Sequence, residues 1–224
     1  MNEILKNIYD RRAVRKYKNV SVSKDLIEIL LDAGRMAPSA MNRQPWKFYV
    51  LTDVKKIKAF SKEIAENAIK EIKHVSPKEA SEVNLSSFHL STMINFLKNE
   101  DHVFYGAPVV IFITSPKTDE WGAIDTGMCA QNIMLAAKAL GLDSCPVGFA
   151  RFITQAKDYY KLNIPDEEQV QLAIIVGYGD EQPEVHRHQA AHERSVRPRE
   201  GIVRARARAR RARGLDLGRP APRG

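Results

Sequence analysis

Apolar positions recur with two different periods along this chain, so the pattern predicts both helices and strands. Helical spacing marks four main segments, at residues 2–10, 23–31, 53–73 and 121–140. Short apolar runs rich in β-branched residues predict strands at residues 48–51, 109–113 and 172–176, the last two of them fully buried. Helices and strands mix without a strict strand–helix–strand rhythm, and the predicted fold class is therefore α+β.

Capping residues support these helix boundaries. Ser23 and Asp53 are expected to cap the helices that follow them, and Gly141 is expected to end the helix that begins at Trp121. This last helix is rich in small residues, which predicts close approach of a neighbouring helix. Further helices are predicted after Ser76-Pro77, at residues 88–97 and at residues 153–161.

The net charge of +8 belongs to the C-terminal tail and not to the body of the chain. Residues 190–224 contain eleven Arg, three acidic residues and no Lys, whereas basic and acidic residues balance in residues 1–189. The tail has almost no apolar surface to bury, so we expect it to be disordered. The chain is accordingly divided into a folded domain at residues 1–188 and an Arg-rich tail at residues 189–224.

Two interpretations of the tail stay open. Arginine-rich arms can bind nucleic acid, and Arg204 to Arg213 would serve for that. A non-native extension is the favoured interpretation, because every Lys gives way abruptly to Arg. The neutral body argues against nucleic-acid binding, so no such partner is expected except through the tail.

Composition also bears on location and metal binding. The chain has no apolar run of roughly 18 residues and no secretory signal, so neither a transmembrane helix nor a membrane partner is expected. Cys129 and Cys145 form neither a CxxC motif nor a metal-binding spacing, and we expect reduced thiols in a cytoplasmic protein. His186, His188 and His192 lack a Cys or carboxylate to complete a metal site, so no metal is predicted.

A cluster of positive charge lies close to the N-terminus. Arg11 and Arg15 are four residues apart and would share one face of a helical turn, and Arg12 adds a third cation. Guanidinium groups match phosphate oxygens with paired hydrogen bonds, so the cluster is a candidate anion site. The residues alone leave a solvated basic surface equally open.

A polar, turn-forming loop follows at residues 37–46. Its two prolines restrict the backbone, and its polar side chains, Ser39, Asn42 and Gln44, offer hydrogen-bond donors and acceptors together. Trp46 at its end either walls a flat ligand or anchors the core ahead of the next strand. The loop is therefore a candidate for binding a flat, hydrogen-bonding ligand.

The chain carries two motifs in a fixed order, RRAVRKY at residues 11–17 and APSAMNRQPW at residues 37–46. Together they resemble the N-terminal signature of the FMN-dependent nitroreductase family. Later segments agree with the resemblance, at residues 99–100, 131–142, 145–149 and 175–179. The resemblance covers residues 1 to about 188.

The resemblance implies a fold, an assembly and a cofactor site. The fold would be an α+β sandwich with a mainly antiparallel central sheet covered by helices, in an intertwined homodimer with two FMN sites at its interface. The residues that it assigns to the FMN phosphate are Arg11, Arg12, Ala13, Arg15 and Arg187. The residues that it assigns to the flavin are Pro38, Ser39, Ala40, Asn42, Asn99, Pro146, Val147 and Gly148.

These residues would act in different ways. The loop at residues 38–42 would reach the flavin from the other subunit, and Asn99 would hydrogen-bond to the isoalloxazine. Residues 146–148 would pass near the ring and offer it backbone N–H groups. Ala13 departs from the Ser usual in the family, which removes one phosphate hydrogen bond worth about 1 kcal/mol. From about Gln189 the Arg-rich tail replaces the apolar segment that packs on the partner in the family, which puts the role of Arg187 in question.

The implied function is that of an FMN-dependent oxidoreductase. FMN carries the chemistry, so no side chain is predicted as a nucleophile. NAD(P)H would deliver hydride, and an electron-poor small-molecule acceptor, a nitroaromatic or a quinone, would follow it into the same pocket with ping-pong kinetics. One alternative is another reaction on the same fold, such as reductive dehalogenation. The other is nucleic-acid binding through the tail.

Overall fold

Helices and strands mix along the chain without strict alternation, as the apolar pattern predicts. The computed structural model describes residues 2–74, 101 and 103–183. Its helices are α1 (Glu3–Asp10), α2 (Lys24–Arg35), α3 (Val54–His74) and α6 (Gly122–Ala139), with the 3₁₀ helices η1 (Ala40–Asn42), η2 (Gly148–Gln155) and η3 (Tyr159–Leu162). Its strands are β1 (Lys47–Leu51), β2 (Val109–Pro116), β3 (Asp143–Val147) and β4 (Glu168–Gly177). The helices predicted after Ser76-Pro77 and at residues 88–97 lie outside the described residues.

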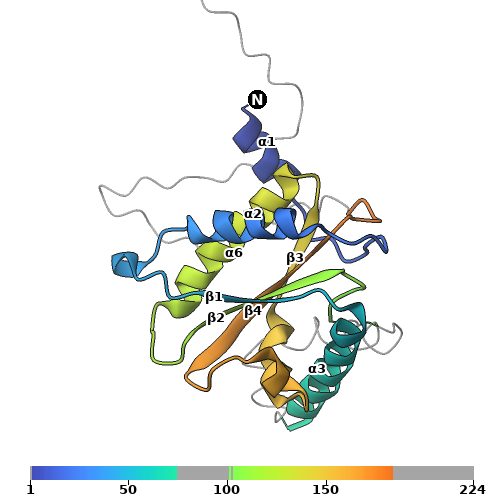
Figure 1. Ribbon diagram of the computed structural model, residues 1–224, viewed down its shortest axis with the longest axis vertical. Coiled ribbons are helices and arrows are strands. Elements are labelled where there is room, and N and C mark those ends of the chain that lie inside the picture. Colours follow the sequence, from blue (N-terminus) through green and yellow to red (C-terminus); the bar gives the residue numbers. More distant parts are fainter. Residues whose placement is uncertain (1, 75–100, 102, 184–224) are drawn as a thin grey trace, which may run out of the picture. The chain divides into compact units, whose positions relative to one another are not determined.

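The strands pair in the order β1-β2-β4-β3, and every neighbouring pair is antiparallel (Figure 1). This confirms the predicted antiparallel sheet. β3 is not predicted by the apolar pattern, because Asp143, Ser144 and Pro146 interrupt it. Proline is tolerated at this position since β3 is the last strand of the order, where one side of the strand needs no full ladder.

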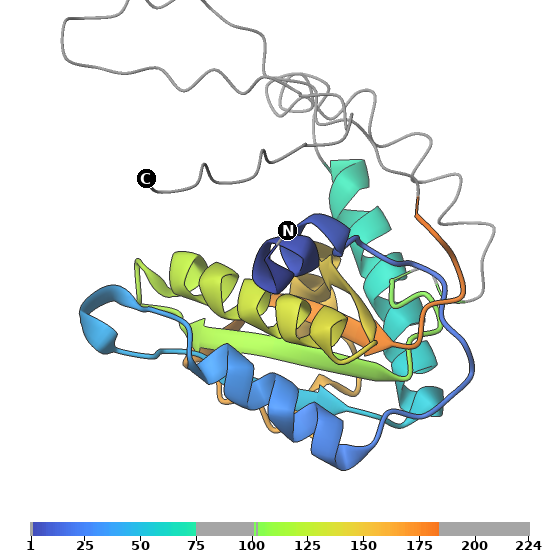
Figure 2. The same ribbon diagram turned by 90° about the horizontal axis from the view of Figure 1, so that it is seen from above.

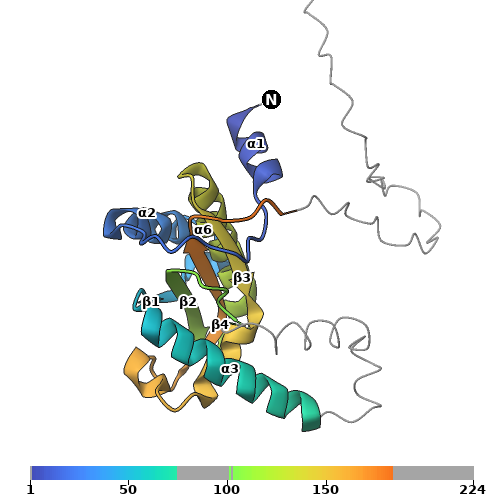
Figure 3. The same ribbon diagram turned by 90° about the vertical axis from the view of Figure 1, so that its right-hand side faces the viewer.

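Alternation along the two central strands divides the core into two layers, one on each face of the sheet. Val110 and Phe112 belong to the cluster that α3 and η2 cover. Ile111 and Ile174 belong to the other cluster, which α2 and α6 cover. Figure 3 shows α3 on one side of the strands and α2 with α6 on the other, and Figure 2 shows α2 and α6 lying over the sheet.

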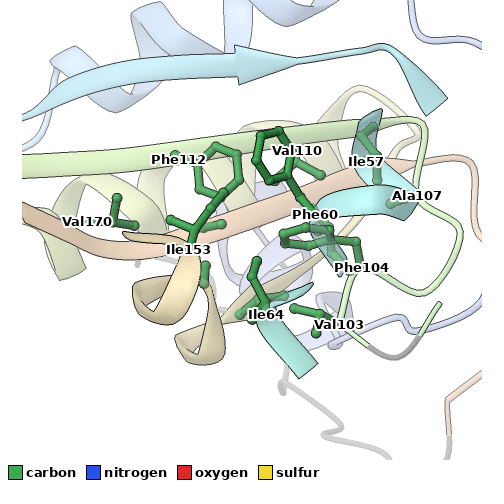
Figure 4. Packing of buried hydrophobic residues seen from close by; sticks show 14 of the residues in the cluster. Ile57, Phe60, Ile64, Val103, Phe104, Ala107, Val110, Phe112, Ile153 and Val170 are labelled. Atoms are coloured by element: carbon green, nitrogen blue, oxygen red, sulfur yellow. The ribbon is translucent and has the colours of Figure 1, made fainter. Parts of the chain in front are cut away.

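The layer under α3 is built around aromatic rings (Figure 4). Phe104 and Phe112 pack edge to face, with ring centroids 5.9 Å apart and an interplanar angle of 85°. Ile57, Phe60 and Ile64 of α3 are buried in the same cluster, as the helical spacing predicts.

α2 and α6 approach each other closely at Gly34. A Cβ atom at this position would lie 2.9 Å from Cγ1 of Ile133 and 3.1 Å from Sγ of Cys129, so a larger residue would push the helices apart. Asn132 Nδ2 also donates a hydrogen bond to the carbonyl of Ala33 at 3.1 Å. The predicted close neighbour of α6 is confirmed, although the glycine that permits the contact is on α2.

The C-terminal end of α6 is confirmed as predicted. Gly141 has a φ of 74°, and the N–H of Leu142 donates to the carbonyl of Ala137 at 2.9 Å. A glycine in this conformation lets the chain leave the helix while it satisfies the last carbonyls. The chain then enters β3 directly, which places the start of that strand at the end of α6.

The single helix predicted at residues 153–161 is wrong. η2 ends at Gln155, Ala156 is extended with φ −75° and ψ 141°, and η3 follows separately. Ala150, Ile153 and Ala156 are all buried in the layer under α3. Their spacing of three residues suits a 3₁₀ helix, in which side chains three apart point the same way.

Glu168 is a buried carboxylate at the start of β4, with 3% of its surface exposed. It accepts hydrogen bonds from the hydroxyl groups of Thr114 and Tyr49 and from Lys47 Nζ. Burial alone would raise the pKa of the Glu168 carboxyl, but the hydrogen bonds from Lys47 and Thr114 outweigh it, and the pKa lies below its ordinary value. This network joins β1, β2 and β4.

Two buried threonines should respond in opposite ways to replacement by valine. Thr126 is fully buried, and its hydroxyl has no hydrogen-bond partner among the described residues, so Thr126→Val should leave the free energy of unfolding unchanged or raise it by about 1 kcal/mol. Thr114→Val removes a hydrogen-bond donor to the Glu168 carboxylate and should lower the free energy of unfolding by about 1–3 kcal/mol. Urea denaturation measures both. An equal loss in the two variants would contradict the assignment.

Both cysteines should be unreactive in the folded protein. Burial raises the pKa of the Cys129 thiol to about 12, and burial also raises that of Cys145 although Arg15 and Arg11 oppose it. At pH 8 the thiolate fraction of Cys129 is then on the order of 10⁻⁴. Titration with a disulfide reagent should find almost no fast-reacting thiol until the protein is unfolded. Rapid labelling of either cysteine in the native protein would show that the core around that cysteine opens to solvent.

Candidate functional site

The segment after α1 crosses the edge of β3 and the end of β4, and its backbone holds it there. Ala13 forms a parallel bridge with Ser144, and the N–H of Val14 donates to the Ser144 carbonyl at 3.2 Å. Further along, the N–H of Lys18 donates to the carbonyl of Tyr178 at 2.8 Å. Val14 is buried, so the segment is anchored on both its backbone and its apolar side. The neighbouring arginine side chains therefore start from fixed positions.

The three arginines of this segment have different partners. The Arg12 guanidinium donates to the carbonyl oxygens of Tyr9 and Arg11, so it closes the C-terminal end of α1. Arg15 lies close enough to Tyr105 and Cys145 for its charge to lower the pKa of both groups against the effect of burial. Among the described residues, Arg11 has no side-chain hydrogen bond or ion pair. Arg11 and Arg15 are thus the arginines best placed to receive an anion, whereas Arg12 is engaged with the backbone.

Two acidic side chains lie beside this cluster. Glu181 accepts a hydrogen bond from the backbone N–H of Arg15. The nearby acid Asp180 is paired with Lys16 at 3.3 Å. Within the described part of the chain, no ion pair joins either acid to a guanidinium of the cluster. The carboxylates therefore hold the segment in place and leave its guanidinium charge available.

Tyr105 is a residue of this site that the sequence motifs miss. It has a φ of 55° in a tight turn, where Asp101 accepts hydrogen bonds from the N–H groups of Phe104 at 3.0 Å and Gly106 at 2.9 Å. Burial raises the pKa of the Tyr105 hydroxyl, while Arg15 acts to lower it. The Tyr-Gly pair before the buried strand predicts a turn, but no local pattern reveals that the turn meets Arg15.

The start of β3 adjoins the arginine segment, since Ser144 of this strand bridges Ala13, and residues 146–148 follow at its other end. Pro146 and Gly148 are exposed, whereas the side chain of Val147 is buried in the layer under α3. Proline has no N–H, so the expectation that all three offer backbone N–H groups is wrong for Pro146. No atom lies within 4 Å of where a Cβ atom of Gly148 would be, so the backbone is open to a ligand there.

The loop at residues 37–46 has an unusual backbone. Met41, Asn42 and Gln44 have φ values of 52°, 54° and 49°, in the left-handed region. Within the loop, Ser39 Oγ accepts from the N–H of Gln44 at 2.9 Å, and Gln44 Nε2 donates to Asn42 Oδ1 at 2.8 Å. The N–H of Ala40 is directed to the carboxylate of Asp125 on α6. Pro38 and Asn42 are exposed, so the loop presents polar groups to its surroundings.

Trp46 belongs to the core and does not wall the candidate site. It is 6% exposed and packs in the cluster beneath α2 and α6. Of the two interpretations of this residue, the core anchor is confirmed. Its burial fixes the C-terminal end of the loop ahead of β1.

One chain does not bring the loop and the arginines together. The loop contacts α6 at Asp125 in the first turn of that helix, whereas Asn7 of α1 donates to the carbonyl of Leu135 near its end. Ten residues of α-helix separate these two contacts by roughly 15 Å. Figure 1 shows η1 at one end of α6 and α1 at the other. The two candidate half-sites thus lie at opposite ends of one helix.

Some predicted features lie outside the described residues. These are Asn99, Arg187, the histidines at residues 186–192 and the Arg-rich tail. In the part that is described, no group of three or more His, Cys, Asp or Glu could hold a metal ion. No described helix is both long and apolar enough to cross a membrane.

A separate pocket of about 170 Å³ lies between α3 and η3. Its floor is apolar, with Leu51, Phe60 and Leu162, and its rim carries charges of both signs, among them Lys56 and Glu63. Neither the arginine segment nor the loop lines it. Its mixed rim gives no excess of positive charge, so this pocket does not bear on the candidate anion site.

Comparison with known proteins shows the family of the chain. A sequence model described as the nitroreductase family matches residues 8–178. A 4-nitrobenzoate reductase of Pseudomonas putida is 30% identical over 198 residues, which cover 80% of this chain and 86% of that protein. A nitrobenzene nitroreductase of Ectopseudomonas oleovorans is 29% identical over 200 residues, covering 77% and 85% respectively.

Solved structures share the fold. A nitroreductase with bound FMN from Bacteroides fragilis has a TM-score of 0.67 at 22% identity, covering 91% of this chain and 100% of that one. An FMN-bound nitroreductase from Desulfitobacterium hafniense has a TM-score of 0.68 at 22% identity, covering 92% and 100%. The family match spans both motifs and all four strands, and the chain belongs to the nitroreductase family.

Proposed function

We propose that this protein is an FMN-dependent oxidoreductase of the nitroreductase type, in which Arg11 and Arg15 bind the FMN phosphate. The observation that carries the proposal is the backbone anchoring of Ala13 and Val14, which lie between these two arginines, at the edge of β3. Membership of the family, together with relatives named as nitroreductases and FMN-bound structures of the same fold, supports the choice of cofactor.

The chemistry of these residues fits an FMN phosphate. Within residues 2–74, 101 and 103–183, neither guanidinium is paired with an acid, and the two offer several charge-assisted hydrogen bonds to a dianion. The open backbone at Gly148 leaves room for a flat ring close to the same edge. Ala13 supplies no hydroxyl to the phosphate, and its neighbour Arg12 is turned toward α1, so fewer groups hold the phosphate than the motif alone implies.

We further propose that the site is completed by a second copy of the chain. The loop at residues 38–42 lies at the far end of α6 from the arginines, so it would serve the site of a partner subunit. Apolar side chains stand exposed on α1 and α6, among them Ile4 at 70%, Trp121 at 52% and Ile124 at 51%. Exposed apolar faces of this kind mark interfaces between proteins, and a homodimer would cover them.

When bound, FMN would supply the transfer of hydride from NAD(P)H to a small electron-poor acceptor, such as a nitroaromatic or a quinone. The side chains of this protein hold the phosphate, orient the ring and exclude water. A single pocket shared by the nucleotide and the acceptor gives ping-pong kinetics.

Replacing both arginines should weaken FMN binding by about 100-fold or more. Arg11→Ala with Arg15→Ala removes charge-assisted hydrogen bonds to the phosphate, each worth about 1.5–3 kcal/mol. Lys16→Ala with Lys18→Ala removes the same charge from the same segment and is the matched control, since both lysines are exposed. Fluorescence titration of the apoprotein with FMN measures the Kd.

The wild-type protein should be yellow when purified, or become so with FMN, and the lysine variant should bind nearly as well. A colourless protein that takes up no FMN would refute the cofactor. An arginine variant with wild-type affinity would refute the phosphate assignment alone.

Mixed dimers should show that each site draws on two subunits. The Arg11→Ala, Arg15→Ala chain keeps an intact loop, and an Asn42→Ala chain keeps intact arginines while its loop loses a residue suited to a positive φ. A heterodimer purified with two different tags should contain one intact site and bind one FMN tightly, while each homodimer binds weakly. If one chain supplied both halves, the heterodimer would have no intact site and bind as poorly as the homodimers.

A further inference from the structure

The loop that would face the flavin is held in a costly backbone conformation. Met41 and Gln44 have positive φ values, which are unfavourable for residues with a Cβ atom, and only Asn42 between them is suited to the region. Such a conformation persists only where surrounding contacts determine it. The hydrogen bonds of Ser39 and Gln44 lie inside the loop, so they shape it without fixing it to the fold.

Asp125 supplies the hydrogen bond that fixes the middle of the loop, at Ala40, to α6. The N–H of Ala40 lies 3.2 Å from both carboxylate oxygens of this residue. Asp125 is in the first turn of α6 and is only 2% exposed. The positive end of the helix dipole favours a carboxylate in this turn. The loop is therefore attached to a helix whose buried apolar residues pack in the core cluster beneath α2 and α6.

No other interaction explains the burial of Asp125. Among the described residues, its only hydrogen-bond donor is the N–H of Ala40, and no Lys or Arg pairs with it. A carboxylate buried with so few donors is a poor way to stabilise a core. Its neighbour Asp119 differs, since that residue caps the N–H of Trp121 at 3.0 Å and lies 3.7 Å from the Arg43 guanidinium.

We propose that Asp125 is a positioning residue of the cofactor site, which sets the loop at residues 38–44 in the conformation that binds FMN. The proposal rests on the proposed function, since it assumes that this loop contacts the flavin. Asp125 does not touch the cofactor itself. It acts through the N–H of Ala40, and it fixes the loop relative to α6, whose exposed apolar side would face the partner subunit.

Titration of the apoprotein with FMN tests this role. Asp125→Ala leaves the N–H of Ala40 without its acceptor, so the loop would occupy its binding conformation for a smaller fraction of the time. The apparent Kd rises by the inverse of that fraction, and we expect it to rise by about tenfold or more. Asp125→Asn keeps an oxygen for Ala40 and should restore most of the affinity, to about threefold weaker than the wild type.

Two variants separate positioning from general stability. Thr126→Val changes the adjacent buried residue on α6, and its hydroxyl makes no hydrogen bond in the described part of the protein. Thr114→Val loses the hydrogen bond to Glu168 and so lowers stability elsewhere in the fold. Both should bind FMN with wild-type affinity. If Thr114→Val weakened FMN binding as much as Asp125→Ala, the loss would be one of stability and the proposal would be overturned.

Hydrogen exchange in the apoprotein gives a readout that needs no cofactor. The peptide containing Ala40 should exchange faster in Asp125→Ala than in the wild type or in Thr126→Val. If the wild type binds no FMN, the proposed function fails, and the role of Asp125 in an FMN site fails with it. If the wild type binds FMN and Asp125→Ala binds it equally well, only the positioning role is overturned.

If Asp125→Ala does not fold, Asp125→Asn tests whether Asp125 positions the loop. A measurable loss of FMN affinity at an unchanged melting temperature would support positioning. Wild-type affinity together with wild-type exchange at Ala40 would overturn it.

Discussion

The packing of α6 against α2 and the sheet is the constraint on which the rest of the structure depends. Gly34 lets Ile133 of α6 approach α2 so closely that a side chain at position 34 would collide with it. With α6 fixed in this way, both of its ends become reference points. Its first turn holds the loop through Asp125, and its end leads through Gly141 into β3, where the arginine segment docks. The distance between the two half-sites is therefore set by the length of a rigid helix and not by flexible connections.

Positive charge is concentrated locally and does not come from the protein as a whole. The body of the chain is neutral, and the excess of +8 lies in the tail. Of the three clustered arginines, Arg12 donates its hydrogen bonds to carbonyl oxygens at the end of α1. The positive charge available to a ligand at the edge of β3 therefore comes from Arg11 and Arg15. Tyr105 lies near Arg15, whose charge opposes the rise that burial causes in the pKa of the Tyr105 hydroxyl.

Local pattern predicts those parts of the fold that depend on local physics. Helical periodicity and capping predict α1, α2, α3 and α6 to within a few residues, and the β-branched runs predict both central strands. The pattern does not predict β3, because Pro146 and its polar neighbours interrupt it. The structure tolerates these residues because β3 is at the edge of the sheet. In the site, the two motifs identify the arginines and the loop. Tyr105 and Asp125 escape because their roles arise from contacts between segments far apart in the sequence, which no local spacing encodes.

The strained loop links cofactor binding to assembly. A loop with positive φ at Met41 and Gln44 stores free energy that must be offset elsewhere, and the N–H of Ala40 on Asp125 offsets part of it within one chain. If a partner's FMN contacts the same loop, it offsets more, and it does so only in the dimer. Binding of FMN would then stabilise the dimer, and by linkage the dimer would bind FMN more tightly than either chain alone. If each FMN site is divided between the two ends of α6 in this way, the cofactor would be part of the dimer interface.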